Sequence, residues 1–258
     1  MQNWITQSEP QPGRVILRLN RPEKRNALTG DMVQQLLGYL EQLTQRSDLW
    51  LLQLEGAGHW FCSGVDLNWM QQMGQAEWSE NLKDAELLAN VLDRLWHFPC
   101  PTLCKVQGGA MGGGLGLLAC CDTVLATSAS RFACSEVRLG LIPAVIAPYL
   151  MHSMGGRQSM QHMLSGEPFS AAEAFRAGLV SELCRDNDAL EQQTQLRIKQ
   201  LQQGHPQALR QCKQLIRQLQ PLSLPLATGQ WLAEIRRSVP ALEGVAAFLA
   251  KRRPNWSN

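Results

Sequence analysis

Apolar and mixed stretches alternate along the first half of the chain in a pattern that predicts parallel βαβ units. Strands are expected at 14–19 and 49–54, and the apolar run at 102–106 is typical of a buried strand. Between the first two strands, residues 31–45 repeat apolar side chains with a helical period. A strand, helix, strand order favours a parallel sheet with right-handed crossovers. The pattern therefore predicts an α/β protein.

The pattern becomes mixed after residue 67 and mostly helical after residue 144. Residues 68–80 combine Trp and Met with polar residues, which suits a mobile helix or lid, and a helix is expected at 81–97. Later, the capping-box pair Ser170 and Glu173 opens a helix before a short strand near 178–180. Beyond residue 187 we expect four amphipathic helices. The breaks between these four helices are expected at Gly204–Pro206, Pro221–Pro225 and Pro240. Further strands are expected earlier in the chain, at 122–127 and 131–136.

A glycine-rich segment joins the strand at 102–106 to a helix. Gly112, Gly113 and Gly114 precede helix-forming Leu and Ala residues. The first turn of a helix has N–H groups without intrahelical partners, and glycine lets a ligand approach them closely. Such a segment suits a phosphate cradle, an oxyanion hole or close helix packing. No Lys follows Gly114, so the phosphate-loop motif is absent. The residues alone leave the oxyanion hole and close packing as open alternatives.

Composition and charge exclude several classes of protein. The 258 residues are 45% hydrophobic, which suffices for one sizeable core. The net charge is only +2 and the longest basic run is Lys251–Arg253, so we expect no nucleic-acid partner. We find no secretion signal and no apolar run of about 18 residues, so we expect a cytoplasmic protein without membrane contact. The eight cysteines lack zinc-ligand spacing, and no metal site is expected.

Several stretches, in order along the chain, resemble the crotonase (enoyl-CoA hydratase/isomerase) superfamily. They are Leu19–Pro22 with Arg25–Leu28, Phe61–Leu67, Gly112–Asp122, Phe132–Pro143, Ala172–Val180 and Glu243–Arg252. The resemblance implies a crotonase-like ββα spiral core at 1–190 and a helical carboxyl-terminal trimerisation region at 191–258. It further implies a homotrimer or hexamer. The implied ligand is an acyl-CoA thioester, so coenzyme A is part of the substrate and no separate cofactor is expected.

The resemblance also implies which residues form the site. The backbone N–H groups of Val65 and Gly113 correspond to the family's oxyanion hole, and Glu136 corresponds to its catalytic carboxylate. For the basic residues Lys24, Arg25 and Lys251, solvated surface is the alternative to a contact with coenzyme A. The substrate-binding positions are Lys24, Arg25, Ala27, Leu28, Ser63, Gly64, Asp66, Gly112, Gly116 and Lys251.

The chain departs from the family's two-glutamate hydratases at Gly116, where those enzymes carry a second carboxylate. Gly116 follows Gly113 by three residues and should share its helix face, pointing into the pocket. A mid-helix glycine costs about 1 kcal/mol relative to alanine, so we expect a gain in space. That space would admit a branched or carboxylated acyl group. Arg138 is a candidate partner for a distal substrate carboxylate or for a structural acid.

A second departure follows Pro143, where residues 144–150 replace a glycine-rich segment of many relatives. With Leu115–Leu117 and Ser135–Ala144, this segment looks most like the bacterial methylglutaconyl-CoA hydratase-like proteins of leucine breakdown.

Reversible hydration of a 2,3-enoyl-CoA thioester is the leading hypothesis. Val65 and Gly113 would stabilise the enolate, and Glu136 would activate the water as a general base. With one carboxylate, the source of the second proton stays open. The first alternative is Δ3–Δ2 isomerisation, in which a single carboxylate moves a proton from C2 to C4. The second is a noncatalytic acyl-CoA-binding member of the family.

Overall fold

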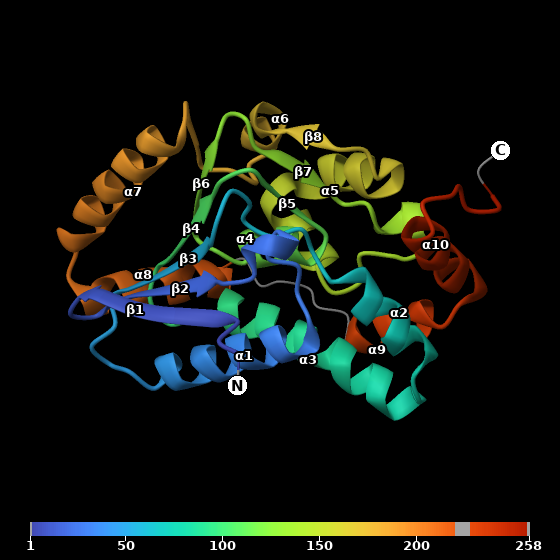
Figure 1. Ribbon diagram of the computed structural model, residues 1–258. Coiled ribbons are helices and arrows are strands. Elements are labelled where there is room, and N and C mark those ends of the chain that lie inside the picture. The colour runs from blue at the N-terminus through green and yellow to red at the C-terminus, as the bar shows by residue number, and fades with distance from the viewer. Residues whose placement is uncertain (1, 220–227, 257–258) are drawn as a thin grey trace.

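A six-stranded sheet organises the structure, a computed structural model that describes residues 2–219 and 228–256 (Figure 1). β1 and β2 form an antiparallel hairpin, and the remaining neighbours are parallel. The predicted α/β class with parallel units is therefore confirmed. In spatial order the strands are β1 (Ile5–Gln11), β2 (Arg14–Leu19), β3 (Leu51–Gly56), β4 (Thr102–Val106), β6 (Thr123–Thr127) and β9 (Glu182–Cys184).

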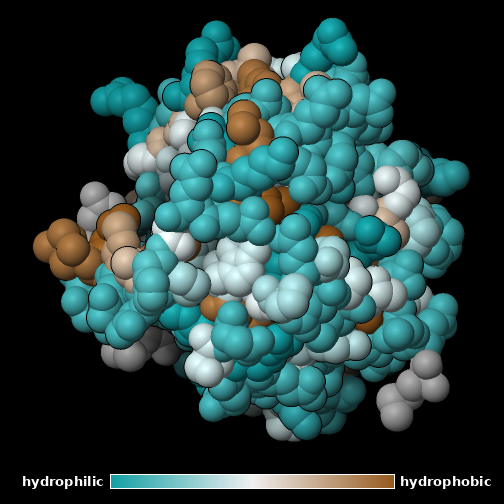
Figure 2. Space-filling model, turned by 90° about the vertical axis from the view of Figure 1, so that its left-hand side faces the viewer, coloured by the Kyte–Doolittle hydropathy of each residue, from teal (hydrophilic) through white to brown (hydrophobic). Residues whose placement is uncertain are grey.

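Both faces of this sheet are covered, which explains why its inner strands are mostly apolar. On one face, Leu51, Leu103 and Leu125 pack with residues of α7 (Asn187–Gln202). On the other face, the side chains of alternate strand residues join the main core beneath helices α1 (Gly30–Thr44) and α3 (Trp78–Trp96). Because successive strand residues point to opposite faces, a strand covered on both sides is mostly apolar. The buried polar residues Arg14, Gln53 and Glu55 are exceptions that hydrogen-bond to one another. The outer side of α7 is mostly hydrophilic (Figure 2).

A second, three-stranded sheet carries the segments that lead to the site. β5 (Gly109–Met111) pairs in parallel with β7 (Arg131–Ala133), and β7 pairs with β8 (Phe169–Ser170). Helix α4 (Gly113–Ala119) begins two residues after β5, as the glycine-rich segment predicts. The helices after β7 include α5 (Ala147–Ser165), with a kink at Gly155, and α6 (Ala171–Arg176).

Two strand predictions need correction. The expected strand at 131–136 ends at Ala133, and a 3₁₀ helix, η2 (Glu136–Leu139), follows. The strand expected near 178–180 lies at Glu182–Cys184 instead. The reason is local: the backbone N–H groups of Leu179 and Val180 donate to the carbonyl of Ala174 and complete the end of α6. They are therefore unavailable for pairing with a strand. The capping box of Ser170 and Glu173 is confirmed.

The segment expected to form a mobile helix or lid contains two helices. α2 (Leu67–Gln75) is followed by α3, which begins at Trp78 rather than at residue 81. Asp66 caps α2, because its side chain accepts hydrogen bonds from the N–H groups of Asn68 and Trp69. This cap fixes the chain direction directly after the loop 63–65.

Four helices follow residue 187 within the described residues, as predicted. After α7 come α8 (Pro206–Leu219), α9 (Thr228–Arg236) and α10 (Val239–Leu249). α9 packs along α3, where the buried Arg236 pairs with Asp84 at 2.6 Å. α10 packs on α2 and on η2 (Figure 1). The break predicted at Pro221–Pro225 lies outside the described residues, and the division at 190/191 stays a prediction.

No helix within residues 2–219 or 228–256 combines the length and the apolar character needed to cross a membrane.

Candidate active site

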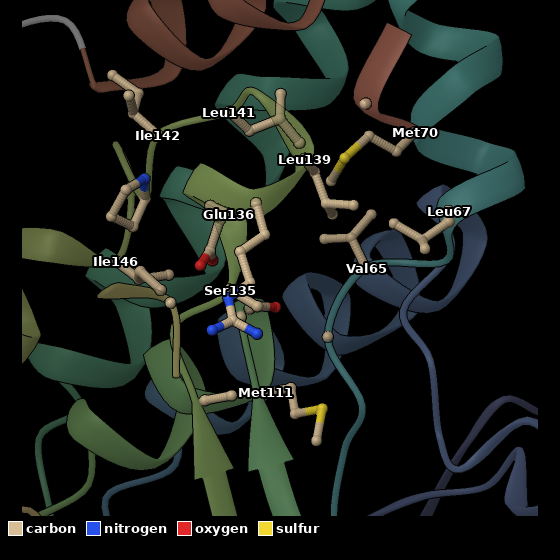
Figure 3. A pocket seen from close by; sticks show the side chains of 18 of the residues that line it. Val65, Leu67, Met70, Met111, Ser135, Glu136, Leu139, Leu141, Ile142 and Ile146 are labelled. Carbon is tan, nitrogen blue, oxygen red and sulfur yellow. The ribbon is translucent and has the colours of Figure 1, made fainter. Parts of the chain in front are cut away.

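A cavity of about 460 Å³ lies where the loop 63–65, the start of α4, the helix η2 and the helix α10 meet (Figure 3). Its wall is mostly apolar. In Figure 3 the carboxyl group of Glu136 lies inside this wall, with Ile146 on the same side of the cavity and Val65 across from them. Apolar cavities with a few convergent polar groups are typical of ligand sites.

Because residue 112 is a glycine, the start of α4, the side chain of Glu136 and the loop 63–65 can lie close together. Gly112 has φ +48°, a left-handed conformation that side chains rarely adopt. A Cβ atom at this position would lie 3.2 Å from Oε1 of Glu136 and 3.9 Å from the Cα atom of Gly64. A larger residue would therefore both strain the backbone and crowd the carboxylate. Gly112 thus brings the carboxylate of Glu136 against the loop 63–65.

Two backbone donors meet beside this carboxylate. Leu28 donates to the carbonyl of Gly64, and Asp66 donates to the carbonyl of Leu28, each at 2.8 Å. These bonds hold the loop so that the N–H of Val65 lies between them. A Cβ atom at Gly113 would lie 3.9 Å from the nitrogen of Val65, so the two amide groups are neighbours. Among residues 2–219 and 228–256, neither N–H has a hydrogen-bond acceptor. Such a pair suits a negatively charged oxygen.

Glu136 carries an ionisable group in an unfavourable place for charge. The residue as a whole is half-buried, but its Oε2 atom is buried and has no hydrogen-bond partner within the described part of the chain. Burial raises the pKa of Glu136, and this effect exceeds the opposing effect of hydrogen bonds from the backbone N–H of Glu136 and the thiol of Cys134. A raised pKa allows a carboxyl group to accept and return a proton near neutral pH.

The structure brings together part of the predicted site. Ser63, Gly64, Val65, Gly112, Gly113 and Glu136 line the cavity. The other predicted residues are absent from its lining: Lys24, Arg25, Ala27, Leu28, Asp66, Gly116 and Lys251.

Three of these outlying residues support the loop from behind. Leu28 is buried, and its Cδ1 atom lies 3.3 Å from the position of a Cβ at Gly113. Ala27 is also buried, and its carbonyl accepts a hydrogen bond from Arg21. Asp66 pairs with Arg21 at 2.8 Å, and although burial opposes it, this pairing holds the pKa of Asp66 below its usual range. These residues support the loop, and their contact with a ligand stays a prediction.

The three basic residues proposed for coenzyme A are exposed. Lys24 is the last residue of the 3₁₀ turn η1 (Pro22–Lys24), and Arg25 follows it. The guanidinium of Arg25 lies 5.3 Å from the ring centroid of Trp60. Lys251 follows α10 with φ +54°. The neighbouring Arg252, rather than Lys251, lines the cavity.

The expectation that Gly116 opens space in the cavity is wrong. A Cβ atom at Gly116 would lie 2.5 Å from Cγ2 of Ile146 and 3.1 Å from Cδ1 of Leu92. The space beside the glycine is therefore filled by two buried apolar side chains. Ile146 itself lines the cavity, whereas Gly116 does not.

Sequence reasoning missed part of the wall. Ile146 lies in the segment 144–150. The departure of this segment from the family pattern was the only sign in the sequence that Ile146 could belong to the site. Phe248 and Arg252 come from the distant α10 region, and only the general match of that segment pointed to it. Arg138 lines the cavity and pairs with Glu167, while its Nε donates to the carbonyl of Ser165.

No group of three or more His, Cys, Asp or Glu side chains suited to a metal ion occurs in the portion that the structure describes.

Comparisons with known proteins agree with this geometry. The family model for enoyl-CoA hydratase/isomerase matches residues 11–258. The 2,3-dehydroadipyl-CoA hydratase of Escherichia coli is 33% identical over 94% of this chain and 94% of its own. The 1,2-epoxyphenylacetyl-CoA isomerase of the same organism is 32% identical over 97% of each chain.

A solved structure gives the same answer for the fold. The crystal structure of an enoyl-CoA hydratase from Shewanella pealeana matches with a TM-score of 0.80 and 34% identity, over 98% of this chain and 96% of that one. The crotonase-like fold implied by the sequence is thereby confirmed. Closeness to the methylglutaconyl-CoA hydratase branch is not confirmed by these matches. The chain belongs to the crotonase (enoyl-CoA hydratase/isomerase) superfamily, whose members act on acyl-CoA thioesters.

Proposed function

We propose that the protein is an enoyl-CoA hydratase that adds water reversibly across a 2,3-enoyl-CoA thioester. The observation that carries this proposal is the convergence of Glu136 with the N–H groups of Val65 and Gly113 in one apolar cavity. The carboxylate oxygen and both amides have no protein partner among the described residues, so they are available to a ligand.

Each group has one task in the proposed reaction. The thioester oxygen accepts hydrogen bonds from Val65 and Gly113, which draws electron density from C3. Glu136 removes a proton from water as the water oxygen bonds to C3, and the negative charge moves to the thioester oxygen as an enolate. The proton held by Glu136 then passes to C2, which returns the carboxylate to its starting state. A single carboxylate with a raised pKa can therefore supply both proton steps.

The charges in the wall favour an acyl group that carries its own carboxylate. Arg138 and Arg252 line the cavity, whereas the acids that pair with them, Glu167 and Glu243, are absent from its lining. The cavity therefore presents two cationic groups to a ligand. A 3-methylglutaconyl thioester from leucine breakdown would fit this charge pattern. One relative is named 2,3-dehydroadipyl-CoA hydratase, and its named substrate is a thioester of a dicarboxylic acid. This name is consistent with a substrate that carries its own carboxylate.

Δ3–Δ2 enoyl-CoA isomerisation is the second candidate, and Ile146 is the observation that favours it. Ile146 and Leu92 occupy the place beside Gly116 where a second carboxylate would help to hold water. An isomerase needs no water and only one carboxylate, which would carry the proton from C2 to C4. The 32% identical relative from Escherichia coli is also named as an isomerase, although of 1,2-epoxyphenylacetyl-CoA rather than of an enoyl thioester.

The test is the absorbance of the conjugated thioester. We expect it to fall with 3-methylglutaconyl-CoA or crotonyl-CoA as water adds. A rise with 3-hexenoyl-CoA and no change with the other two would establish the isomerase instead. No change with any substrate, together with tight binding of acyl-CoA, would favour a noncatalytic binding protein.

A further inference from the structure

Gly116 and Ile146 are far apart in the sequence but pack closely against each other. Gly116 lies within α4, and Ile146 precedes the first residue of α5. The Cγ2 atom of Ile146 lies only 2.5 Å from where a Cβ at Gly116 would be, which is closer than real Cβ contacts come. We call the space beside Gly116 the glycine notch. The β-branched methyl of Ile146 occupies the glycine notch.

The backbone of Ile146 is fixed by the turn before α5. The N–H of Ile146 donates to the carbonyl of Pro143 at 3.2 Å, and the N–H of Ala147 donates to the same carbonyl at 2.9 Å. The side chain of Ile146 is 2% exposed. Cδ1 of Leu92 lies 3.1 Å from the same Cβ position at Gly116, so the glycine notch is closely packed. The turn before α5 and this packing hold the side chain of Ile146 in place.

The remaining arm of Ile146 faces the ligand space. Ile146 lines the cavity while its Cγ2 atom occupies the glycine notch, which leaves the Cγ1–Cδ1 arm as the part available to face the ligand space. Figure 3 shows Ile146 on the same side of the cavity as Glu136. An acyl group that reacts at Glu136 must therefore pass close to this arm.

We propose that Ile146 is a specificity-determining residue: held in the glycine notch, it forms a rigid wall that limits the size of the acyl group near Glu136. This inference rests on the proposed function, because it assumes that the cavity holds the acyl part of a thioester. In a rigid apolar wall, one methylene group changes selectivity about 10-fold to 200-fold. We expect Ile146 to reduce most strongly the binding of acyl groups that have a substituent near C3.

Two substitutions separate the two arms of Ile146. Ile146→Val keeps the branched methyl in the glycine notch and shortens the arm toward the cavity. Ile146→Leu removes the branched methyl and places its bulk farther out. Ile142→Val is a matched control, since Ile142 also lines the cavity but is 37% exposed.

The experiment measures binding of two unreactive saturated thioesters, butanoyl-CoA and 3-methylbutanoyl-CoA, by calorimetry. For Ile146→Val we expect the affinity ratio to shift toward the branched thioester by about 10-fold or more. Ile146→Leu should shift it toward the straight chain, and Ile142→Val should leave it near the wild-type value. Unchanged ratios in both Ile146 variants, or an equal shift in Ile142→Val, would overturn the inference.

These outcomes are separate from a failure of the proposed function. If the wild-type protein bound neither thioester, the proposed function would fall and this inference with it. If both thioesters bound and no enoyl thioester reacted, the catalytic proposal would fall. The shift of the ratio would in that case still establish Ile146 as the residue that limits acyl size.

Discussion

Glu136 is placed where a charged carboxylate is costly. Its Oε2 atom is buried without a partner in the described part of the chain, and burial raises its pKa. An oxygen that lacks hydrogen bonds in the free protein gains them when a water molecule or a C–H acid enters the cavity. The same arrangement that weakens the free protein thus prepares the carboxylate for proton transfer.

Glu136→Gln should lower turnover by about 10²-fold to 10⁴-fold, because the amide cannot accept a proton. Binding of saturated acyl-CoA should change little, since the shape of the side chain is kept. Steady-state kinetics and calorimetry on the same preparations measure the two effects. Unaltered turnover would remove Glu136 from the mechanism.

The pH dependence of activity follows from the direction of the same shift. Glu136 must be ionised to act as a base, and its folded pKa lies above the ordinary value of 4.5. The rate of hydration should therefore fall on the acid side at a higher pH than an exposed glutamate would give. A kcat/KM profile with its acid limb at or below pH 4.5 would contradict this expectation.

Stability should respond in the opposite direction to activity. A carboxyl group with a raised folded pKa favours folding while it is protonated, and that contribution is lost as pH rises from 4.5 through the folded pKa. Glu136→Gln has no such loss. The variant should therefore gain stability relative to wild type as pH rises toward 7, which urea unfolding at several pH values can measure. A constant difference across pH would count against the shift.

At the scale of elements, the contact between α4 and α5 depends on the absence of one side chain. Gly116→Ala would place a methyl group against Ile146 and Leu92, both of which are buried. Overpacking of this kind costs about 1–3 kcal/mol, although a mid-helix alanine returns part of that cost. We expect a net loss of stability, measured by thermal unfolding. The double variant Gly116→Ala, Ile146→Ala should relieve the clash, so two additive losses would argue against the contact.

Helix α8 is attached to the body by charge rather than by apolar burial. None of its residues is buried. Lys213 and Arg217 both pair with Asp122, at 2.6 and 2.9 Å, and Arg210 donates to the carbonyl of Leu49 at 2.6 Å. The side chains of Lys213 and Arg217 are only 9% and 16% exposed, so salt should weaken this attachment less than it would weaken a fully exposed pair.

Asp122→Asn should loosen α8 without unfolding the sheet. The side-chain amide oxygen can still accept from the N–H of Thr102, while the charge that holds Lys213 and Arg217 is lost. Hydrogen exchange should speed up in α8 and stay unchanged in β4. Asp188→Asn, on α7, is the control for a change of charge. Equal protection of α8 in both variants would show that charge does not hold it.

Comparing the predicted helices and strands with the observed ones shows which of them the local sequence pattern determines. Strands buried on both faces and helices with a clear period, such as 102–106 and α1, were predictable because each follows from its own residues. The strand at Glu182–Cys184 was predicted near 178–180 instead, because the pattern does not show that the N–H groups of Leu179 and Val180 are bonded at the end of α6. The filling of the space beside Gly116 could not be predicted either, since it depends on where a distant turn places Ile146.

At the scale of the whole molecule, α8 carries an apolar face that no residue within 2–219 or 228–256 covers fully. Leu215, Ile216 and Leu219 are 53%, 53% and 72% exposed. We expect a second copy of the chain to cover this face, within the homotrimer or hexamer that the family resemblance implies. Light scattering measures the mass directly. Ile216→Lys should lower it, while Leu196→Lys on α7 should not, and a wild-type monomer at micromolar concentration would contradict the expectation.

The cavity also has a consequence for how the protein is made. Its wall combines the loop 63–65 with Gly244, Phe248 and Arg252, so early and late parts of the sequence meet there. On the ribosome, the segments from β1 to β6 emerge long before α7, which covers one face of the sheet, and before α10. Until α10 has emerged, the cavity lacks one wall and has no defined acyl site. Competence to bind a thioester is therefore a late event in synthesis.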